Sequence, residues 1–231
     1  MFRSINDRRP ARLVIVSGWA FDWRPFAELR LPLGCVVYTG ENLQQFAADL
    51  RRWLRLQQSK TISLLGWSMG AYAVADFAVN HPEVVEQLIL VAARSRYSPE
   101  DIEPVRTHLR QRRKAFLGKF YRDCFSAGEG PMYQWFRTTL WREYLEQMTT
   151  GRLNRGLDWL SRARLDCDRL QSCADLVLVQ GTADRIASPE EAQQLAQALP
   201  RARTVWLGDA GHLPFLNSDF AEQVYGKTKR D

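Results

Sequence analysis

The sequence predicts an α/β fold, in which a mostly parallel sheet is flanked by helices and carries one inserted helical segment. Three observations support this prediction. Short apolar runs alternate with stretches of helical periodicity, as in successive β–α–β units. The alternation is interrupted once, by more than eighty residues between Val91 and Asp175 without a convincing strand. The length of 231 residues fits one domain with such an insertion.

Six short apolar segments are the expected strands, and β-branched residues are frequent in them. They are Leu13–Val16, Val36–Tyr38, Thr61–Leu65, Gln87–Val91, Asp175–Gln180 and Thr204–Leu207. Three helices are expected between them. Glu41–Gln57 places its apolar residues on one stripe, Met69–Val79 is rich in alanine, and Pro189–Leu199 begins after Ser188, a plausible N-cap.

Residues 97–165 are expected to form a helical cap, inserted into a core of residues 1–96 and 166–231, because this stretch is too long for a loop. The segment Gly128–Pro131 would divide the cap into at least two helical parts. The cap also carries most of the net charge. It holds 13 Lys and Arg against 8 Asp and Glu, a net charge of +5, whereas the remainder holds 19 against 18, a net charge of +1.

The composition argues against several classes of protein. The apolar run Leu13–Val16 is too short for the core of a signal peptide, and no stretch approaches the roughly 20 apolar residues of a membrane helix. A cytoplasmic protein without a membrane span is therefore expected. Three histidines and four scattered cysteines, without a CxxC pair, predict neither a zinc site nor a redox centre. No metal and no cofactor are expected.

The segment Gly66-Trp67-Ser68-Met69-Gly70 lies between an expected strand and an expected helix. This strand–turn–helix context gives meaning to a G-x-S-x-G pattern, which marks Ser68 as the nucleophile of a serine hydrolase with the α/β-hydrolase fold. The turn is so tight that we expect a strained backbone at Ser68. Side chains at positions 66 and 70 would collide with neighbouring backbone, so both must be small.

A general base and an acid are expected after later strands, because open α/β sheets place their sites at the carboxyl ends of strands. Of the three histidines, His81, His108 and His212, only His212 follows a strand in this way. Asp184 comes directly after the penultimate strand, in the chain order Ser, Asp, His. Its competitor is Asp209, which lies three residues before His212. We expect Ser68, Asp184 and His212 to form the catalytic triad.

Two backbone N–H groups should bind the oxyanion of the tetrahedral intermediate. One belongs to Met69, the residue after the nucleophile, and the other to Trp19, in the loop after the first strand. The Trp19 indole would also line the binding site for the acyl chain. Alternatively, this side chain could simply pack in the core.

The chain resembles the pimeloyl-acyl-carrier-protein methyl ester esterases of biotin synthesis, from about Leu13 to the C-terminus. The resemblance depends on five segments, which are Ser17-Gly18-Trp19, Gly66–Gly70, Gly156–Leu160, Gly181–Ile186 and Gly211–Leu216. It implies an α/β-hydrolase fold with a helical cap, hydrolysis of a methyl ester, and acyl carrier protein as the partner. Ser17 departs from the family, which usually has His there, so the hydrogen bonding behind this loop must differ. The cap is the weakest part of the match.

The segment from 106 to 122 holds seven basic residues and no acidic one. On a helix, Val105, Leu109, Phe116 and Phe120 share a stripe, with Leu117 and Tyr121 beside it. Candidate contacts to the acyl chain are Phe116, Phe120 and Tyr121. Such a basic face could steer an acidic protein. The carrier protein that the resemblance implies would dock on Arg106, Arg110, Arg113, Lys114 and Arg122.

Alternatives remain open for the basic segment and for the whole protein. The segment could be a merely solvated face, and nucleic-acid binding is not expected because no recognised motif accompanies the charge. The protein could be a general short-chain carboxylesterase or thioesterase without a carrier-protein partner. It could also be a non-catalytic relative that only binds a ligand, which the presence of Ser68, Asp184 and His212 argues against.

Overall fold

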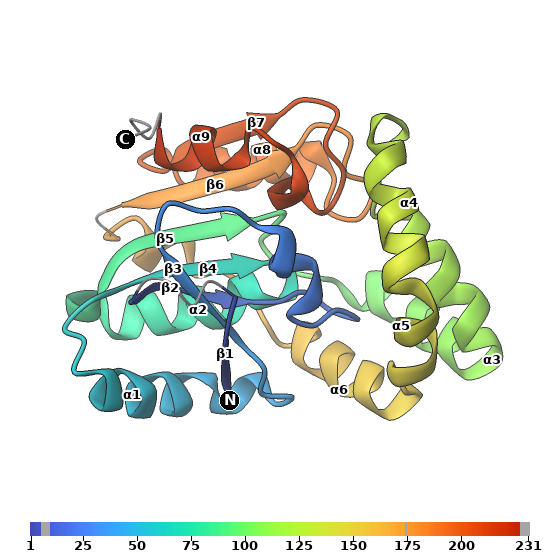
Figure 1. The fold of residues 1–231 in the computed structure, drawn as a ribbon, viewed down its shortest axis with the longest axis horizontal. Coiled ribbons are helices and arrows are strands. Elements are labelled where there is room, and N and C mark those ends of the chain that lie inside the picture. The colour runs from blue at the N-terminus through green and yellow to red at the C-terminus, as the bar shows by residue number, and fades with distance from the viewer. Residues whose placement is uncertain (6–9, 174, 227–231) are drawn as a thin grey trace.

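The computed structural model describes residues 1–5, 10–173 and 175–226. These residues form a seven-stranded sheet with the strand order β1-β3-β2-β4-β5-β6-β7 (Figure 1). All neighbouring strands are parallel except β1, which is antiparallel to β3. The strands are β1 Phe2–Ser4, β2 Ala11–Val16, β3 Gly34–Tyr38, β4 Ile62–Trp67, β5 Val85–Val91, β6 Leu176–Gly181 and β7 Arg203–Leu207.

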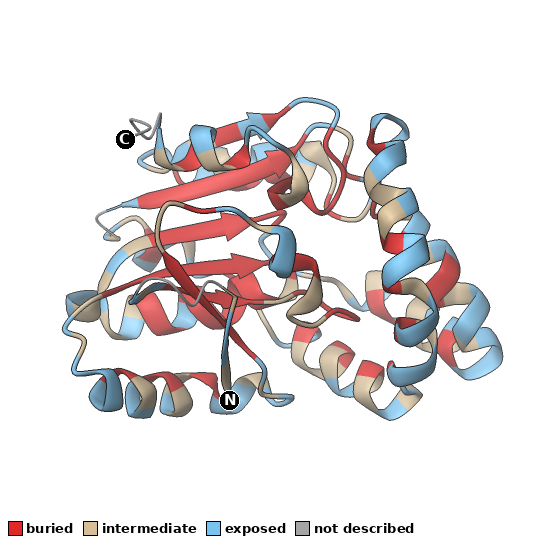
Figure 2. Cartoon of the chain, in the orientation of Figure 1, coloured by how far each residue is buried: buried red, intermediate tan, exposed pale blue. Residues whose placement is uncertain are grey.

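The six strands expected from the sequence are thus confirmed, and β1 is an additional short strand at the edge. Strands β3, β4 and β6 are buried at every residue, and β2 is buried from Leu13 onward (Figure 2). Burial along the whole strand explains why these segments read as continuous apolar runs, because helices cover both faces of a parallel sheet. The predicted α/β-hydrolase fold is confirmed.

Four helices flank the sheet, and three of them were expected. They are α1 Phe46–Gln57, α2 Met69–Asn80, α8 Pro189–Ala198 and α9 Phe220–Tyr225. Helix α1 lies against α2, where the rings of Phe46 and Phe77 meet edge to face. Ser188 caps α8 as expected, since its hydroxyl accepts the N–H of Glu191. Helix α9 had no clear signal in the sequence, yet it buries Phe220 and Val224.

Of the five α-helices described between β5 and β6, four lie within residues 97–165. They are α3 Pro99–Asp123, α4 Gly130–Thr139, α5 Trp141–Gln147 and α6 Thr150–Leu160, and α7 Cys167–Leu170 leads on to β6. We refer to α3–α6 as the inserted helices. In Figure 1 they stand beyond the arrowheads of the strands, which is the carboxyl edge of the sheet. Helix α3 is kinked at Arg112, whose φ and ψ of −147° and 55° are not helical.

Gly128 lies between α3 and α4 and Gly130 begins α4, at the break that the sequence indicated. Within the described ranges, no helix combines the length and the apolar character that crossing a membrane requires.

Candidate active site

Ser68 occupies the sharp turn between β4 and α2. Its φ of 52° and ψ of −115° are strained for a residue with a side chain. The turn is held by the Ser68 N–H, which donates to the Val91 carbonyl at 2.8 Å. A Cβ at Gly70 would lie 2.2 Å from the Val16 carbonyl oxygen, and one at Gly66 would lie 2.5 Å from the Ala71 Cα. The expected need for small residues on both sides of Ser68 is therefore confirmed.

The three side chains predicted for the triad lie in one hydrogen-bonded row. The His212 Nε2 is 3.0 Å from the Ser68 Oγ, and the His212 Nδ1 is 2.8 Å from an Asp184 carboxylate oxygen. The three residues follow β4, β7 and β6, so the carboxyl edge of the sheet brings them together. They are 6%, 2% and 3% exposed in the order Ser68, His212, Asp184. The arrangement is compatible with a proton relay from serine to histidine.

The Asp184 carboxylate is held from three further directions. Its Oδ1 accepts the backbone N–H groups of Ile186 and Ala187 at 2.8 and 3.0 Å, and its Oδ2 accepts the amide of Gln180 at 3.1 Å. These donors supply hydrogen bonds to both oxygens of a buried carboxylate. The competitor Asp209 is exposed, and its backbone N–H donates to the Thr182 hydroxyl. Asp184 is therefore the acid that faces His212.

Two residues that sequence reasoning did not assign to this role hold the backbone of the loop around His212. The Trp67 indole N–H donates to the His212 carbonyl at 2.6 Å. The Gly211 N–H donates at 2.9 Å to Glu129, a buried carboxylate between α3 and α4. Burial is the main reason that the pKa of Glu129 is raised, although the N–H groups of Ser126 and Gly211 oppose this. A Trp in the G-x-S-x-G pattern was visible in the sequence, but nothing there linked Glu129 to His212.

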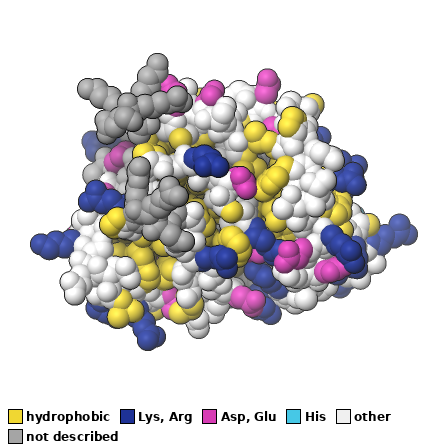
Figure 3. Space-filling view, in the orientation of Figure 1, with side chains coloured by type: hydrophobic (Ala, Val, Ile, Leu, Met, Phe, Trp, Pro, Cys, Tyr) yellow, Lys and Arg dark blue, Asp and Glu magenta, His cyan; other side chains and the backbone are white. Residues whose placement is uncertain are grey.

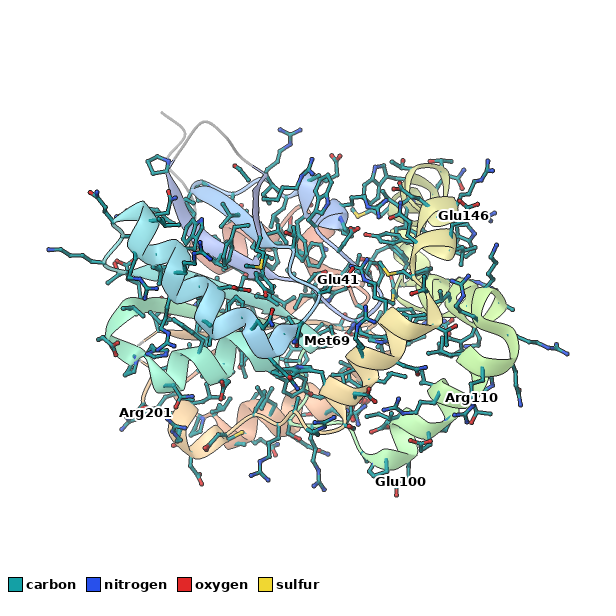
Figure 4. The ribbon with its side chains drawn as sticks, turned by 90° about the horizontal axis from the view of Figure 1, so that it is seen from below. Glu41, Met69, Glu100, Arg110, Glu146 and Arg201 are labelled. Atoms are coloured by element: carbon teal, nitrogen blue, oxygen red, sulfur yellow. The ribbon has the colours of Figure 1, made fainter. Side chains whose placement is uncertain are left out.

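The loop after β2 contains the second expected oxyanion donor, and we call residues 17–22 the oxyanion loop. The Phe21 N–H donates to the Gly18 carbonyl at 3.4 Å, and Ala20 within this turn has a φ of 62°. Among the described residues, neither the Trp19 nor the Met69 N–H donates to a backbone carbonyl. Both donors are thus available to a ligand oxygen. Figure 4 places Met69, the first residue of α2, near the centre of the view.

The hydrogen bonding behind the oxyanion loop is supplied by Ser17. Its hydroxyl donates to the Asp22 carbonyl at 2.9 Å and so joins the two ends of the loop. This contact shows how the loop is closed in a chain that has Ser where the similar family usually has His.

A cavity of about 270 Å³ opens beside Ser68, between the sheet and the inserted helices. The ring of Trp19 lies 5.1 Å from that of Phe120 and 6.4 Å from that of Phe116, between centroids, and all three side chains line this cavity. Two of the three candidate chain contacts in α3 therefore face the space above Ser68, together with Trp19.

The third candidate, Tyr121, does not line the cavity, and this expectation is wrong. Tyr121 is fully buried, packs against Phe21 and Phe136, and donates its hydroxyl to the Ala20 carbonyl at 2.9 Å. The reason is helical geometry, because consecutive residues are about 100° apart around the axis. Phe120 therefore points into the cavity while Tyr121 points into the core.

Tyr97, in the segment between β5 and α3, also lines the cavity and faces the nucleophile. Burial raises the pKa of its phenol to about 12, and the nearby Ser68 hydroxyl opposes this shift. The Arg94 guanidinium lies over the Tyr97 ring, 4.6 Å from its centre. Sequence reasoning missed Tyr97 because a single tyrosine in a connecting segment matches no motif.

The five basic residues predicted to dock a partner differ in their surroundings. Arg110, Lys114 and Arg122 are exposed. Arg106 is paired with Asp158 at 2.7 Å. Figure 4 shows Arg110 on the side of α3 away from Met69, and Figure 3 shows Lys and Arg side chains around the margin of the molecule where the inserted helices lie.

Arg113 is turned inward, which corrects its expected place in the docking surface. Its guanidinium donates to the carbonyls of Leu145 and Met148, at 2.8 and 2.6 Å, so it satisfies the carboxyl end of α5. No group of three His, Cys, Asp or Glu side chains that could hold a metal ion occurs in the part of the chain that the structure describes.

The amino-acid sequence of this chain is similar to that of known proteins. The chain matches the alpha/beta hydrolase family over residues 3–225. A pimeloyl-[acyl-carrier protein] methyl ester esterase from Nitrosomonas europaea is 31% identical over 173 residues, which cover 70% of this chain and 67% of that protein. A putative non-heme bromoperoxidase from Mycobacterium tuberculosis is 27% identical over 202 residues, which cover 76% of this chain and 70% of that protein.

Solved structures agree with this relationship at the level of the fold. The enol-lactonase from Burkholderia xenovorans superposes with a TM-score of 0.77 over 96% of this chain and 92% of that one, at 19% identity. At this identity the likeness concerns the fold alone.

Proposed function

The chain belongs to the α/β hydrolase family as a carboxylic ester hydrolase, and we propose that its substrate is the methyl ester of pimeloyl-acyl carrier protein. The products would be pimeloyl-acyl carrier protein and methanol, in the cytoplasmic synthesis of biotin. The hydrogen-bonded row of Ser68, His212 and Asp184 is the single observation that carries the chemistry. The esterase from Nitrosomonas europaea supports the choice of substrate.

In this proposal His212 accepts the Ser68 proton as the serine oxygen attacks the ester carbonyl carbon. Asp184 keeps the ring of His212 in place and stabilises the imidazolium that forms. The N–H groups of Trp19 and Met69 bind the resulting oxyanion. The carbonyl carbon–methoxy bond then breaks, and methanol leaves with the proton from His212.

Water completes the cycle by attacking the acyl-enzyme while His212 accepts one of its protons. The carbon–Ser68 bond breaks, the serine oxygen regains a proton from His212, and the free carboxylic acid departs. None of these steps requires a metal or a redox cofactor.

The carrier protein would dock on three exposed cations of α3, namely Arg110, Lys114 and Arg122. Its acyl chain would enter the cavity lined by Trp19, Phe116 and Phe120 and bring the distal ester to Ser68. Arg106 and Arg113 are less suited to this contact, because they are engaged with Asp158 and with the end of α5.

The proposal is tested by incubating the wild type and Ser68→Ala with pimeloyl-acyl-carrier-protein methyl ester and following the loss of the methyl group by mass spectrometry. We expect complete hydrolysis by the wild type and a drop of about 10⁶ in kcat for the variant, as in other triads. Near-normal turnover by Ser68→Ala would contradict the assignment of the nucleophile. No turnover by the wild type would contradict the substrate.

The docking surface is tested by changing Arg110, Lys114 and Arg122 to Glu together. Charge reversal should weaken turnover of the carrier-linked ester, chiefly through association, and leave hydrolysis of p-nitrophenyl butyrate unchanged. A matched control reverses Arg51, Arg52 and Arg55 on α1, three cations remote from the inserted helices. Equal losses on both esters would argue against docking at this surface.

A second candidate is a general short-chain carboxylesterase or thioesterase without a carrier protein. The observation that favours it is the internal engagement of Arg106 and Arg113, which leaves a smaller basic surface than the sequence indicated. A kcat/KM for free dimethyl pimelate equal to that for the carrier-linked ester would favour this candidate.

A further inference from the structure

Three of the inserted helices make hydrogen bonds to the oxyanion loop. Tyr121 on α3 donates its hydroxyl to the Ala20 carbonyl at 2.9 Å. Tyr144 on α5 donates its hydroxyl to the Asp22 carboxylate at 2.6 Å. The Trp19 indole N–H donates to the Leu153 carbonyl on α6 at 2.9 Å. All three bonds reach the loop between residues 19 and 22, beside the backbone N–H of Trp19.

Inside the loop, the Ser17 hydroxyl bonds the Asp22 carbonyl at 2.9 Å and joins the two ends, whereas the peptide units between them have weaker support. The internal backbone bond of the loop, from the Phe21 N–H to the Gly18 carbonyl, is 3.4 Å long and therefore weak. Ala20 has a φ of 62°, which is unfavourable for a residue with a Cβ. The bond from Tyr121 ends on the carbonyl of this same residue. A shorter bond from outside thus holds the peptide unit between Ala20 and Phe21, on the far side of the strained residue that follows Trp19.

We propose that Tyr121 is a positioning residue for the oxyanion hole. Its phenol holds the Ala20 carbonyl and thereby keeps the Trp19 N–H directed at the oxygen that becomes negative when Ser68 attacks. Tyr144 supports the same loop at Asp22, where Arg24 also bonds the carboxylate. The inference rests on the proposed ester hydrolysis, because the oxyanion exists only if Ser68 adds to a carbonyl or to a similar electrophile.

A purely structural role for Tyr121 is the competing explanation. Its ring packs at 5.1 Å from that of Phe21 and at 5.3 Å from that of Phe136, so removing the whole side chain would disturb the core. Tyr121→Phe keeps the ring and removes only the hydroxyl. This variant therefore separates positioning of the loop from packing.

The control is Tyr225→Phe. The Tyr225 hydroxyl is buried and has no hydrogen-bond partner among the described residues, and it lies on α9, away from the inserted helices. The two substitutions are chemically identical, and only one of them removes a hydrogen bond to the oxyanion loop. Tyr144→Phe is a second test at the other end of the loop.

The experiment measures the rate at which a fluorophosphonate probe labels Ser68, together with kcat and KM for p-nitrophenyl butyrate and the thermal midpoint. The phosphonyl oxygen of the probe takes the place of the oxyanion, so the labelling rate reports on its donors. Removing one donor typically costs ~10²–10³ in kcat. For a donor that is misdirected and still present, we expect a smaller loss, on the order of tenfold, in both labelling and kcat.

For Tyr121→Phe, KM should stay within about twofold, since the hydroxyl does not line the cavity, and Tyr225→Phe should match the wild type. A lower thermal midpoint with an unchanged labelling rate would overturn the inference, because it would show a structural role only. If Tyr121→Phe does not fold, an unchanged labelling rate in Tyr144→Phe would overturn it as well. Wild-type labelling without hydrolysis of the carrier-linked ester would count against the proposed substrate and leave this inference standing.

Discussion

The carboxyl edge of the sheet and the inserted helices contribute to the site in different ways. The edge carries the three reactive side chains, each in a loop that directly follows β4, β6 or β7. The inserted helices carry no member of the triad. They hold the oxyanion loop instead, through the phenol of Tyr121 at Ala20, and the segment between α3 and α4 adds the carboxylate of Glu129 at Gly211. The difference indicates that the inserted part of the chain adds bonds that orient the loops, beside those that Ser17 and Trp67 make within the core, and supplies no reactive group.

The largest loss of activity should follow from a substitution at the carboxyl edge of the sheet. Asp184→Asn should lower kcat for p-nitrophenyl butyrate by about 10⁴, because the amide no longer fixes the required tautomer of His212. Asp209→Asn is the matched control, since Asp209 is an exposed carboxylate three residues before His212. Steady-state kinetics with an activated ester measures both. Similar losses in the two variants would contradict the assignment of Asp184 as the acid.

A smaller loss of activity should follow from a substitution in the inserted helices that displaces the Trp19 side chain. A Cβ at Gly156 on α6 would lie 2.5 Å from the Trp19 Cδ1, so Gly156→Ala should displace the indole. Overpacking of this kind typically costs about 1–3 kcal/mol in stability. We expect kcat to fall by roughly tenfold, a modest loss beside that of a deleted oxyanion donor.

The control for this prediction is Gly151→Ala, at the start of the same helix. A Cβ there would meet only the flexible end of Arg155, at 3.9 Å. Its kcat should equal that of the wild type, and chemical unfolding should show no loss of stability. If Gly156→Ala also kept full activity, contact with α6 would not matter for the loop.

The smallest expected effect is on the free energy of unfolding. It arises from Glu129 and depends on pH. Burial raises the pKa of this carboxyl, so its contribution to stability is complete below the unfolded-state pKa of about 4.3 and is lost as the pH rises through the folded-state value. Glu129→Gln cannot ionise. Its free energy of unfolding relative to the wild type should therefore increase as the pH rises through this range.

Urea unfolding at a series of pH values measures this difference. Glu28→Gln removes an exposed carboxyl and serves as the control, for which we expect a nearly constant difference. A constant difference for Glu129→Gln as well would contradict the raised pKa of Glu129.

The reactive residues at the carboxyl edge of the sheet could be predicted from the sequence, because short local patterns mark each of them. Ser68 lies inside a five-residue pattern, and Asp184 and His212 each come shortly after a recognisable strand. A parallel sheet then brings the ends of these strands to one edge, so the order of the elements is enough to assemble the triad.

The role of the inserted helices could not be predicted in the same way. The kink at Arg112 interrupts α3, and the apolar stripe divides into a side that lines the cavity, with Phe116 and Phe120, and a side that enters the core, with Tyr121. Periodicity alone does not distinguish these two sides. Arg113 looked like a surface charge, but it bonds carbonyls more than thirty residues away in the chain. Hydrogen bonds from side chains to distant backbone leave no pattern in a single sequence.

In the proposed mechanism, the strained turn at Ser68 carries the one activated nucleophile of the site. The most direct test is to treat the wild type with a fluorophosphonate probe and to locate the adduct by intact-mass measurement and peptide mapping. We expect a single adduct on Ser68, formed by the wild type and absent from His212→Ala. No adduct, or an adduct on another residue, would contradict it.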